Sequence, residues 1–473
     1  MGAETPKLQY LQGFGSSHSS EAIPGALPRG RNNPQKPPYG LVCEKVSGTA
    51  FTAPRKENQQ TYVHKIKTSA TFSEGKSRYL YRILPAVVHD RWTPYHRAYA
   101  PNDSSRSGSS ENSSNLLGTE TSLIPDQIRW SPFEIEDGND FVTGMRLVCS
   151  AGSPESKSGL AIYIYTSTQS MPERQCFYSA DGDMLVVPQR GTLSIQTELG
   201  KLLVEPTEIV VVPRGIRFRV ENGLNGDDHL RGYILEIFGP NHFQLPELGV
   251  VGSSGCANPR DFQIPVAAFD TSSVTEWEVI AKYAQRLFVI RQNHTPFDVV
   301  GWHRTYYPYK YDLKLFNAVN SVTYDHLDPS VFTVLTCQSA IHGTAIADFA
   351  AVPPHMWVVT EDTYRPPWYH RNIMSEFVGL IQGQLEGKSG QAFAPGGASL
   401  HSVMSGHGPD AGAHKTATEA ELNPVRTGAN ITFMFESSLF LGVSMWALDT
   451  CGKIQADYNS HWEAIKPNFA LPG

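Results

Sequence analysis

Short runs in which apolar and polar residues alternate, each bounded by glycine or proline, restrict this chain to a mainly β fold. In residues 193–199, Leu193, Ile195, Thr197 and Leu199 fall on one side of an extended chain, because strand side chains point alternately to opposite faces. The 473 residues include 40 glycines and 33 prolines, which supply turns between short strands. Helical periodicity is weak throughout. We therefore expect many strands and few helices.

The strand-like runs fall into two sets, which predicts two β units. The first set lies at 193–199, 209–212 and 233–238, and the second at 332–337, 376–381 and 431–435. A single hydrophobic core stops growing at about 250–300 residues, so a chain of this length is expected to divide. We expect an N-terminal β-sandwich in residues 1–290 and a second β unit in residues 291–473.

One segment of the first unit resembles part of a known β motif. Residues 213–220, PRGIRFRV, follow a hairpin and look like the second half of a cupin motif. Arginine or phenylalanine stands where that motif has a metal-binding histidine. We therefore expect the first unit to lack metal ligands.

Charge and composition exclude two classes of partner. The net charge of −7 and the pI near 6.1 provide no clustered basic surface for nucleic acid or an anionic membrane. The N-terminus shows no apolar signal segment, and no apolar run approaches the roughly 20 residues that a membrane helix needs. The six cysteines form no Cys-x-x-Cys pair, which is typical of reduced thiols. We expect a cytoplasmic protein, with the Ser- and Asn-rich residues 102–115 as a mobile surface loop.

Four possible metal ligands lie close together in the last third of the chain, namely His370, Glu376, His401 and His407. Two imidazoles and one carboxylate on one face of a metal suit non-haem Fe(II) and leave positions open for a substrate and oxygen, although zinc accepts the same ligands. On a straight strand His370 and Glu376 would be about 20 Å apart, so the chain must turn at Arg371 and its neighbour Asn372. Hydrogen-bonded histidines of a β core are the alternative, and the residues alone leave both open.

A further histidine, His303, lies in the aromatic-rich run WHRTYYPYKYD. A neutral imidazole accepts a phenol proton near neutral pH, which makes His303 a candidate general base. A structural histidine at a strand end is the alternative. The sequence contains no dinucleotide-binding, Walker, Gly-x-Ser-x-Gly or His-Glu-x-x-His motif, so nucleotide binding, serine hydrolysis and zincin chemistry lack support.

Many longer segments together resemble the homogentisate 1,2-dioxygenase family over almost the full length of the chain. They occur in the family's order and are RNNPQKPPYGLVCEKVSGTAFTAPR (31–55), YLYRILP (79–85), FYSADGDMLVVPQRG (177–191), NPRDFQIPVAAFD (258–270), PYKYDL (308–313), HLDPSVFTVLT (326–336), YRPPWYHRN (364–372), MSEF (374–377), SLHSVMSGHGPD (399–410) and FMFESS (433–438).

The resemblance implies a β-sandwich N-terminal domain, a cupin-like C-terminal domain in a bicupin-type arrangement, and a hexamer built from two trimers. It implies Fe(II) held by His370, Glu376 and His407, with His303 as general base and His401 behind the ligands. His303 and His407 are expected to contact the substrate.

The implied reaction opens an aromatic ring with molecular oxygen as co-substrate. The substrate binds the iron through a hydroxyl that becomes a phenolate, and oxygen binds at an adjacent position, so that one metal replaces a bimolecular encounter. The ring supplies the electrons. Attack beside the acetate side chain turns homogentisate into maleylacetoacetate.

The chain departs from the family pattern at three places near the expected substrate. Arg304 follows His303 where the family has glycine, and Leu385 stands where the family has a tyrosine that contacts the substrate. Residues 62–78 form an insertion. A lost hydrogen-bond donor costs about 1–3 kcal/mol when its buried partner is left unsatisfied, which is enough to change substrate preference.

These departures leave two alternatives to ordinary homogentisate cleavage. One is a diverged paralogue that cleaves another hydroquinone or a polyketide-derived aromatic in secondary metabolism. The other, from a different class, is a catalytically inactive bicupin that serves binding or assembly.

Overall fold

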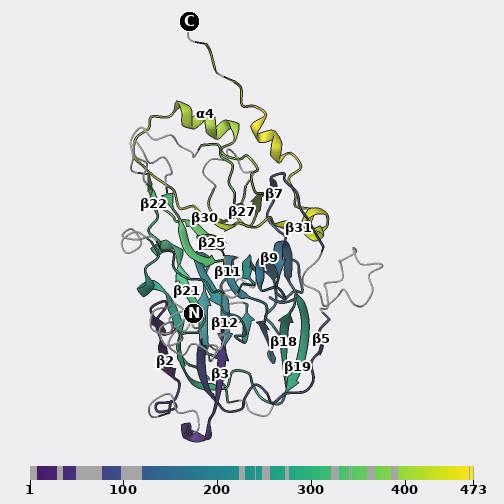
Figure 1. Cartoon of the computed structure of the whole chain (residues 1–473), viewed down its shortest axis with the longest axis vertical. Helices are drawn as coiled ribbons and strands as arrows, with labels where there is room; N and C mark the ends of the chain where they lie inside the picture. Colours follow the sequence, from purple (N-terminus) through teal and green to yellow (C-terminus); the bar gives the residue numbers. More distant parts are fainter. Residues whose placement is uncertain are drawn as a thin grey trace, which may run out of the picture.

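The computed structural model shows a mainly β protein that extends along one axis (Figure 1). At one end lies α4 (Ala411–Glu419), and at the other lie β2 (His18–Glu21) and β3 (Val42–Ser47). The structure describes residues 8–28, 36–48, 77–96, 120–222, 229–239, 241–247, 256–271, 276–320, 330–339, 341, 343–358, 368–384, 393–467 and 469–471.

The centre of the first unit is a pair of large sheets. The ten-stranded sheet has the order β1 (Tyr10–Gln12), β17 (Gln263–Pro265), β21 (Tyr309–Asp312), β14 (Glu208–Val212), β11 (Asp183–Arg190), β16 (Leu230–Ile237), β9 (Ser158–Ser167), β8 (Met145–Ser153), β31 (Gly442–Ser444) and β6 (Thr121–Ser122). The seven-stranded sheet has the order β13 (Gly200–Val204), β12 (Leu193–Thr197), β15 (Phe218–Glu221), β10 (Gln175–Ser179), β18 (Trp277–Tyr283), β19 (Arg286–Gln292) and β5 (Thr93–Pro94).

A smaller sheet and the sheet of the second unit complete the layers. The four-stranded sheet runs β2, β20 (Val299–Arg304), β4 (Ser77–Arg82) and β3. The second unit contains a six-stranded sheet of β24 (Thr333–Gln338), β25 (Ala345–Val352), β30 (Ile431–Ser437), β27 (Ser375–Gln382), β28 (Ala398–His401) and β7 (Ile128–Trp130). Two short pairs are β22 (Val319–Asn320) with β23 (Ser330–Val331) and β26 (Trp357–Val358) with β29 (Val425–Arg426).

The described helical segments are short, as the weak helical periodicity predicts. Besides α4 they are 3₁₀ turns at Pro38–Gly40, Pro259–Asp261, Leu313–Leu315 and Tyr458–Trp462 and a π turn at Trp446–Thr450. Within the described part of the chain, none of these helices has the length and apolar character to cross a membrane.

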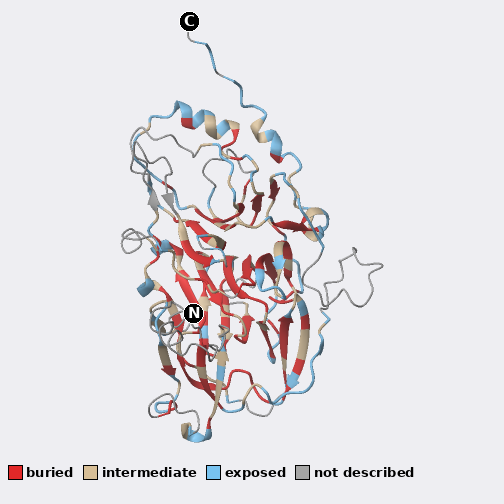
Figure 2. Ribbon diagram, viewed as in Figure 1, coloured by how far each residue is buried: buried red, intermediate tan, exposed pale blue. Residues whose placement is uncertain are grey.

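Buried residues concentrate in the strands in the middle of the molecule (Figure 2). In β12 the residues alternate as the sequence predicts, with Leu193, Ile195 and Thr197 buried and the residues between them partly exposed. Leu199 lies in the turn after the strand. All six strand-like runs coincide with strands, so the mainly β fold class with two β units is confirmed.

The two units exchange strands. β7, far before the second unit in sequence, pairs with β28 of the six-stranded sheet, and β31, near the C-terminus, pairs with β8 of the first unit. β20 and β21, which follow residue 291, pair with strands of the first unit. The division between residues 290 and 291 stays a prediction.

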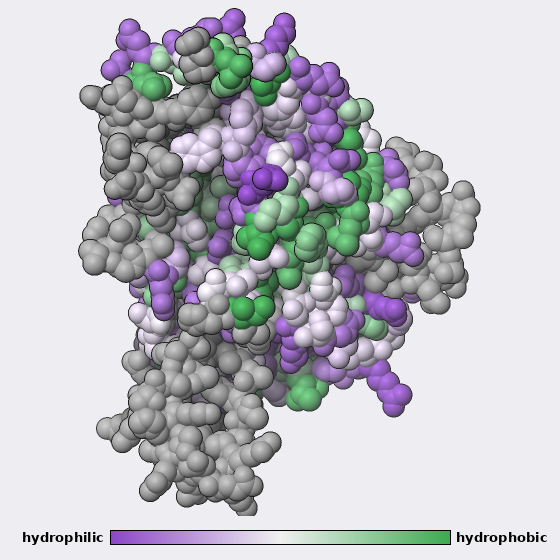
Figure 3. Space-filling view, turned by 45° about the horizontal axis from the view of Figure 1, so that its top comes forward, coloured by the Kyte–Doolittle hydropathy of each residue, from purple (hydrophilic) through white to green (hydrophobic). Residues whose placement is uncertain are grey.

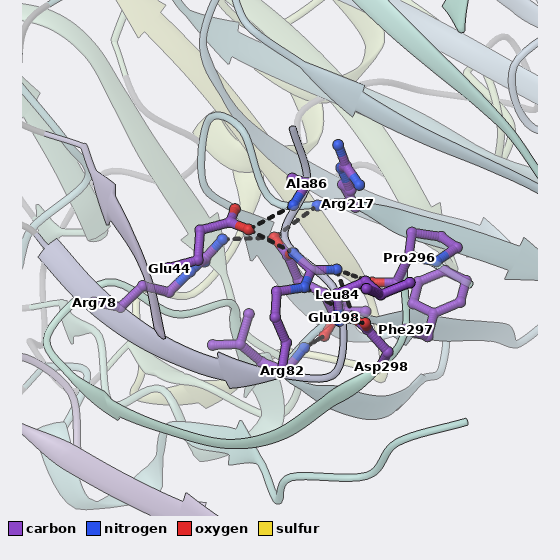
Figure 4. Close-up of polar contacts among 12 residues, drawn as sticks. Glu44, Arg78, Arg82, Leu84, Ala86, Glu198, Arg217, Pro296, Phe297 and Asp298 are labelled. Atoms are coloured by element: carbon purple, nitrogen blue, oxygen red, sulfur yellow. Dashed lines mark hydrogen bonds and ion pairs between the residues drawn. The ribbon is translucent and has the colours of Figure 1, made fainter. Parts of the chain in front are cut away.

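A buried network of ion pairs joins strands of the first unit (Figure 4). The guanidinium of Arg82, in β4, lies 2.7 Å from Asp298 and 3.5 Å from Glu198, and Glu44 approaches it at 3.3 Å. Arg78 approaches Glu198 at 2.6 Å. Because the two arginine side chains have no solvent exposure, these carboxylates supply the charge balance that burial requires.

A second buried group repeats this compensation around a lysine. Lys282 in β18 is fully buried, and its ammonium lies 2.5 Å from Asp181 and 2.8 Å from Glu236. Burial would lower the pKa of Lys282, but the carboxylates around it hold that pKa above its ordinary value.

Several expectations fall on residues that the structure does not describe. The Ser- and Asn-rich loop at 102–115, most of the insertion at 62–78, and Leu385 lie outside the described residues. The structure has all six cysteines as free thiols.

Candidate metal centre

The two histidines of the predicted ligand set are held by a backbone bridge. The amide of His370 donates to the carbonyl of His407 at 3.0 Å, and the amide of His407 donates to the carbonyl of His370 at 3.0 Å. Their ring centres are 4.2 Å apart. A contact between segments distant in sequence therefore fixes both imidazoles.

The third ligand, Glu376, reaches the histidines because the chain bends before β27. The bend lies at Ile373 and Met374, slightly later than the sequence predicts, and Asn372 holds it. The Asn372 side chain accepts from the Met374 amide at 3.0 Å and donates to the Glu376 carboxylate at 2.9 Å. Sequence reasoning gave Asn372 no role of this kind.

The three predicted ligands converge on one point. One donor atom from each of His370, Glu376 and His407 lies within 4.8 Å of the others. Glu376 is 3.1 Å from Nε2 of His407 and 3.8 Å from Nε2 of His370. Across the described residues, this is the one group of three His, Cys, Asp or Glu side chains arranged to hold a metal ion.

Hydrogen bonds on the far side of each ring determine which nitrogen faces the centre. Nδ1 of His370 donates to the carbonyl of Trp368 at 3.1 Å, and Nδ1 of His407 donates to the carbonyl of Ser405 at 2.9 Å. A neutral imidazole that donates from Nδ1 presents its Nε2 lone pair inward, as metal-binding histidines do. Lone pairs that face the Glu376 carboxylate need a cation between them, so the residues fit a metal ion.

The electrostatics of the cluster are dominated by carboxylates. Burial would raise the pKa of Glu376, but the imidazoles that surround it, those of His370, His401 and His407, hold that pKa well below its usual range. Burial, together with the charges of Glu376 and Asp348, raises the pKa of Glu436 to about 7. Excess buried negative charge of this kind favours a cation.

These carboxylates form a row across neighbouring strands. Asp348 in β25 is paired with Glu436 in β30, which is paired with Glu376 in β27, which is paired with His401 in β28. Directly paired residues of adjacent strands share a face of the sheet. No lysine or arginine in the described ranges forms an ion pair with any of the three carboxylates.

His401 lies against two of the three predicted ligands, His407 and Glu376. Its ring stacks on His407 with centres 4.1 Å apart, and its Nδ1 is 3.7 Å from Glu376. Its Nε2 is 3.2 Å from the hydroxyl of Tyr458. Tyr458 was missed from sequence, because nothing in its local pattern connects it with the histidines.

His303 does not join this cluster. It lies in β20, between β2 and β4, at the end of the molecule opposite to α4 (Figure 1). Its ring stacks on Tyr79 and Tyr81, with centres 5.3 and 5.8 Å away, and its Nε2 is 3.3 Å from the Tyr81 hydroxyl. The structure thus brings together four of the five predicted site residues.

A cavity of about 440 Å³ opens beside the metal cluster. It is lined by Tyr369, His370, Arg371, Gly406, His407, Trp462 and Ile465. Figure 3 turns this end of the molecule forward and shows hydrophobic residues gathered among hydrophilic ones. The lining therefore combines aromatic walls, one cation and two of the predicted metal ligands.

Comparisons with known proteins cover nearly the whole chain. The family model "Homogentisate 1,2-dioxygenase N-terminal" matches residues 9–78 and 70–313, and "Homogentisate 1,2-dioxygenase C-terminal" matches residues 314–469. A solved cupin 2 conserved barrel domain protein from Leptotrichia buccalis has a TM-score of 0.24 and 6% identity over 63% of this chain and 89% of that one, which is too low to carry an argument.

Three curated relatives carry the name homogentisate 1,2-dioxygenase. The protein of Emericella nidulans is 51% identical and covers 98% of this chain and 96% of its own length. The Drosophila melanogaster protein is 48% identical, with 98% and 99% covered, and the Homo sapiens protein is 46% identical, with 98% and 97% covered. This chain therefore belongs to the homogentisate 1,2-dioxygenase family.

Proposed function

We propose that this chain is an Fe(II)-dependent dioxygenase that opens the ring of homogentisate with molecular oxygen to give maleylacetoacetate. The observation that carries the proposal is the convergence of His370, Glu376 and His407 on one point beside a cavity. Membership of a family of ring-cleaving dioxygenases supplies the reaction and the substrate.

The ligand set favours iron over a closed structural site. Two imidazoles and one carboxylate occupy one face of a metal and leave the remaining positions to substrate and oxygen. The backbone carbonyls that accept from Nδ1 of His370 and His407 keep both rings oriented, and Asn372 does the same for Glu376. When bound, Fe(II) supplies adjacent open positions at which a phenolate and oxygen meet.

The cavity fits a small aromatic acid. Tyr369 and Trp462 give it aromatic walls against which a ring packs, and Arg371 gives it a cation for the acetate carboxylate. A ring held between these groups and the metal meets oxygen in a fixed orientation, which replaces a bimolecular encounter.

The general-base role of His303 stays a prediction, and its position requires a second copy of the chain. Because His303 lies at the far end of its own chain from the metal cluster, it acts on the substrate only when a second copy supplies it. The hexamer of two trimers expected from the family provides such copies. His303→Gln chains mixed with His370→Ala chains, dissociated and reassembled, test this. Recovered turnover supports the role, and no recovery leaves His303 as a structural partner of Tyr79 and Tyr81.

The two alternative functions receive less support. The comparisons contain nothing that favours a diverged paralogue, and an inactive bicupin has no need of a converging ligand set with oriented Nε2 atoms. The hexameric assembly and the cytoplasmic location follow from the family resemblance and remain predictions.

The decisive experiment is oxygen uptake by the full chain after anaerobic loading with Fe(II). We expect homogentisate to support uptake above every member of a panel of substituted hydroquinones, with maleylacetoacetate as product. The same protein loaded with Zn(II) is the control and is expected to be inactive. Faster uptake with another hydroquinone contradicts the substrate, and no uptake with any of them contradicts the dioxygenase proposal.

A further inference from the structure

A buried arginine lies behind the metal cluster without a hydrogen-bonded counter-ion. Arg129 is in β7, where it is paired with Ser399 of β28, and only 1% of its surface is exposed. None of its guanidinium nitrogens meets hydrogen-bond geometry with a described residue. Burying a charge without such partners costs several kcal/mol, so this side chain needs an explanation.

The guanidinium is packed against aromatic rings. Its central carbon lies 4.0 Å from the centre of the Tyr458 ring and 5.1 Å from the centre of the Phe393 ring. A cation over the face of an aromatic ring is attracted by the ring's electrons, and the attraction grows when both are desolvated. Arg129 is therefore held chiefly through Tyr458, which is itself only 2% exposed.

Tyr458 connects Arg129 to the metal ligands. Its hydroxyl is 3.2 Å from Nε2 of His401, whose Nδ1 is 3.7 Å from the carboxylate of Glu376. If Nε2 carried the hydrogen, the Nδ1 lone pair would face a carboxylate, which is unfavourable. A hydroxyl that donates to Nε2 places the hydrogen on Nδ1 instead, where it faces Glu376.

The cation over the ring strengthens that donation. A positive charge against a phenol stabilises negative charge on its oxygen, so the hydroxyl becomes a better donor to His401. The same charge compensates part of the negative potential of the carboxylate row that ends at Glu376. Arg129 is not among the residues that line the cavity, and its guanidinium forms no hydrogen bond with the three ligands, so the route from it to them runs through Tyr458 and His401.

We propose that Arg129 is a positioning residue of the metal centre, which rests on the proposed function of that centre. Arg129 polarises Tyr458, Tyr458 donates to Nε2 of His401, and His401 presents its Nδ1 hydrogen to Glu376 and so fixes the orientation of the carboxylate. Loss of any member leaves Asn372 to orient the carboxylate without this second contact, which weakens metal binding before any chemistry takes place.

The test measures metal affinity in a double-mutant cycle. Co(II), which has a visible spectrum, is titrated against a competing chelator into full-length wild type, Arg129→Met, Tyr458→Phe and the double variant. Changes to residues that orient metal ligands cost roughly tenfold or more in metal affinity, and we expect each single variant to lose about tenfold. Because both act through one contact, the double variant is expected to lose no more than the weaker-binding single variant.

Two further variants guard against a purely structural effect. Arg217→Met removes another buried arginine, one that donates to Gln292 in the first unit, and is expected to lower stability while leaving Co(II) affinity and spectrum unchanged. Arg129→Lys keeps the charge and is expected to lose less affinity than Arg129→Met. If Arg129→Met does not fold, Tyr458→Phe and Arg129→Lys still complete the comparison, since Tyr458→Phe must lose affinity on its own.

The outcomes distinguish the role of Arg129 from the proposed function on which it rests. Wild type that binds neither Co(II) nor Fe(II) overturns the proposed function. Wild type that binds Co(II), with Arg129→Met and Tyr458→Phe binding as tightly as wild type, overturns only the role of Arg129. Additive losses in the double variant also overturn it, because they mean that Arg129 and Tyr458 act independently.

Discussion

The two β units of this protein bury charge in opposite ways. In the first unit, buried Arg82 and Lys282 each lie against carboxylates of opposite charge. In the second, Asp348, Glu436 and Glu376 form a row on one face of the sheet, and no described lysine or arginine pairs with them. The first arrangement is complete in itself. In the second, no such cation is supplied by the described residues.

This difference separates structural charge from functional charge better than residue type does. Both units contain buried acids, and a search for acidic residues alone would not distinguish them. In the first unit, each buried cation lies against acidic side chains of the chain itself, and the pair of Lys282 with Glu236 joins strands of two different sheets. In the second, imidazole Nε2 atoms and a carboxylate meet at one point, which favours a divalent metal.

The largest expected effect comes from removing a ligand in the second unit. His370→Ala is expected to abolish iron retention and turnover, a loss well beyond the roughly 100-fold that changes behind the ligands cause. Its fold and assembly should persist, because the His370 side chain is exposed and lies outside the named strands. Metal analysis and circular dichroism check this. Retained turnover would refute the ligand assignment.

The next effect belongs to the first unit. Lys282→Met leaves Asp181 and Glu236 buried without their cation, and removing one partner of a buried pair costs about 3–5 kcal/mol. Urea denaturation of the full chain measures the loss. Lys314→Met, which removes a half-exposed lysine near Asp312, is the control and should cost less than about 1 kcal/mol. If Lys282→Met weakens iron binding at matched folded fraction, the two units are not independent.

A smaller effect is the pH dependence of the metal-free protein. The pKa of Glu436 is raised from 4.5 to about 7 in the folded chain, so its contribution to stability is fully present below about pH 4.5 and is lost as pH rises through 7. We expect this loss to amount to about 1–3 kcal/mol. Denaturation midpoints at about pH 5 and about pH 8 measure this loss of stability for wild type and Glu436→Gln. An equal pH dependence in the two proteins would contradict the raised pKa of Glu436.

The smallest effect is expected at Arg304, beside His303. Its φ of 106° is a conformation that favours glycine, and its guanidinium lies 5.2 Å from the Tyr79 ring. Arg304→Gly relieves strain of about 1–3 kcal/mol but loses a cation–π contact of about 0.5–1 kcal/mol and adds backbone freedom to the unfolded chain of about 0.5–1 kcal/mol. Thermal denaturation should therefore change little. A marked fall in turnover would show that this end of the molecule contributes to the reaction.

The sequence predicted the features that depend on residues close together in the chain. Alternation placed strands such as β12. The short stretch that holds His370, Glu376, His401 and His407 marked a candidate metal site, the family resemblance reduced it to His370, Glu376 and His407, and the structure brings these three together. The bend came later than expected because Asn372, whose side-chain bonds the sequence does not display, holds it.

The remaining features depend on contacts between distant segments. Arg129 and Tyr458 lie far apart in sequence and meet only because β7 pairs with β28 and the C-terminal segment returns to the same place. The position of His303 away from the metal cluster follows from its pairing with β2 and β4, which no motif announces. The chemistry of a side chain identifies it as a candidate site residue. The pairing of strands determines which candidate residues lie close together.

The iron content of the full chain tests the central claim most directly. After anaerobic Fe(II) loading and removal of free metal, we expect close to one iron per chain in wild type and none in Glu376→Gln, with both proteins equally folded. Equal iron in the two proteins, or no iron in wild type, would contradict the claim that the carboxylates of the second unit are balanced by a bound metal ion.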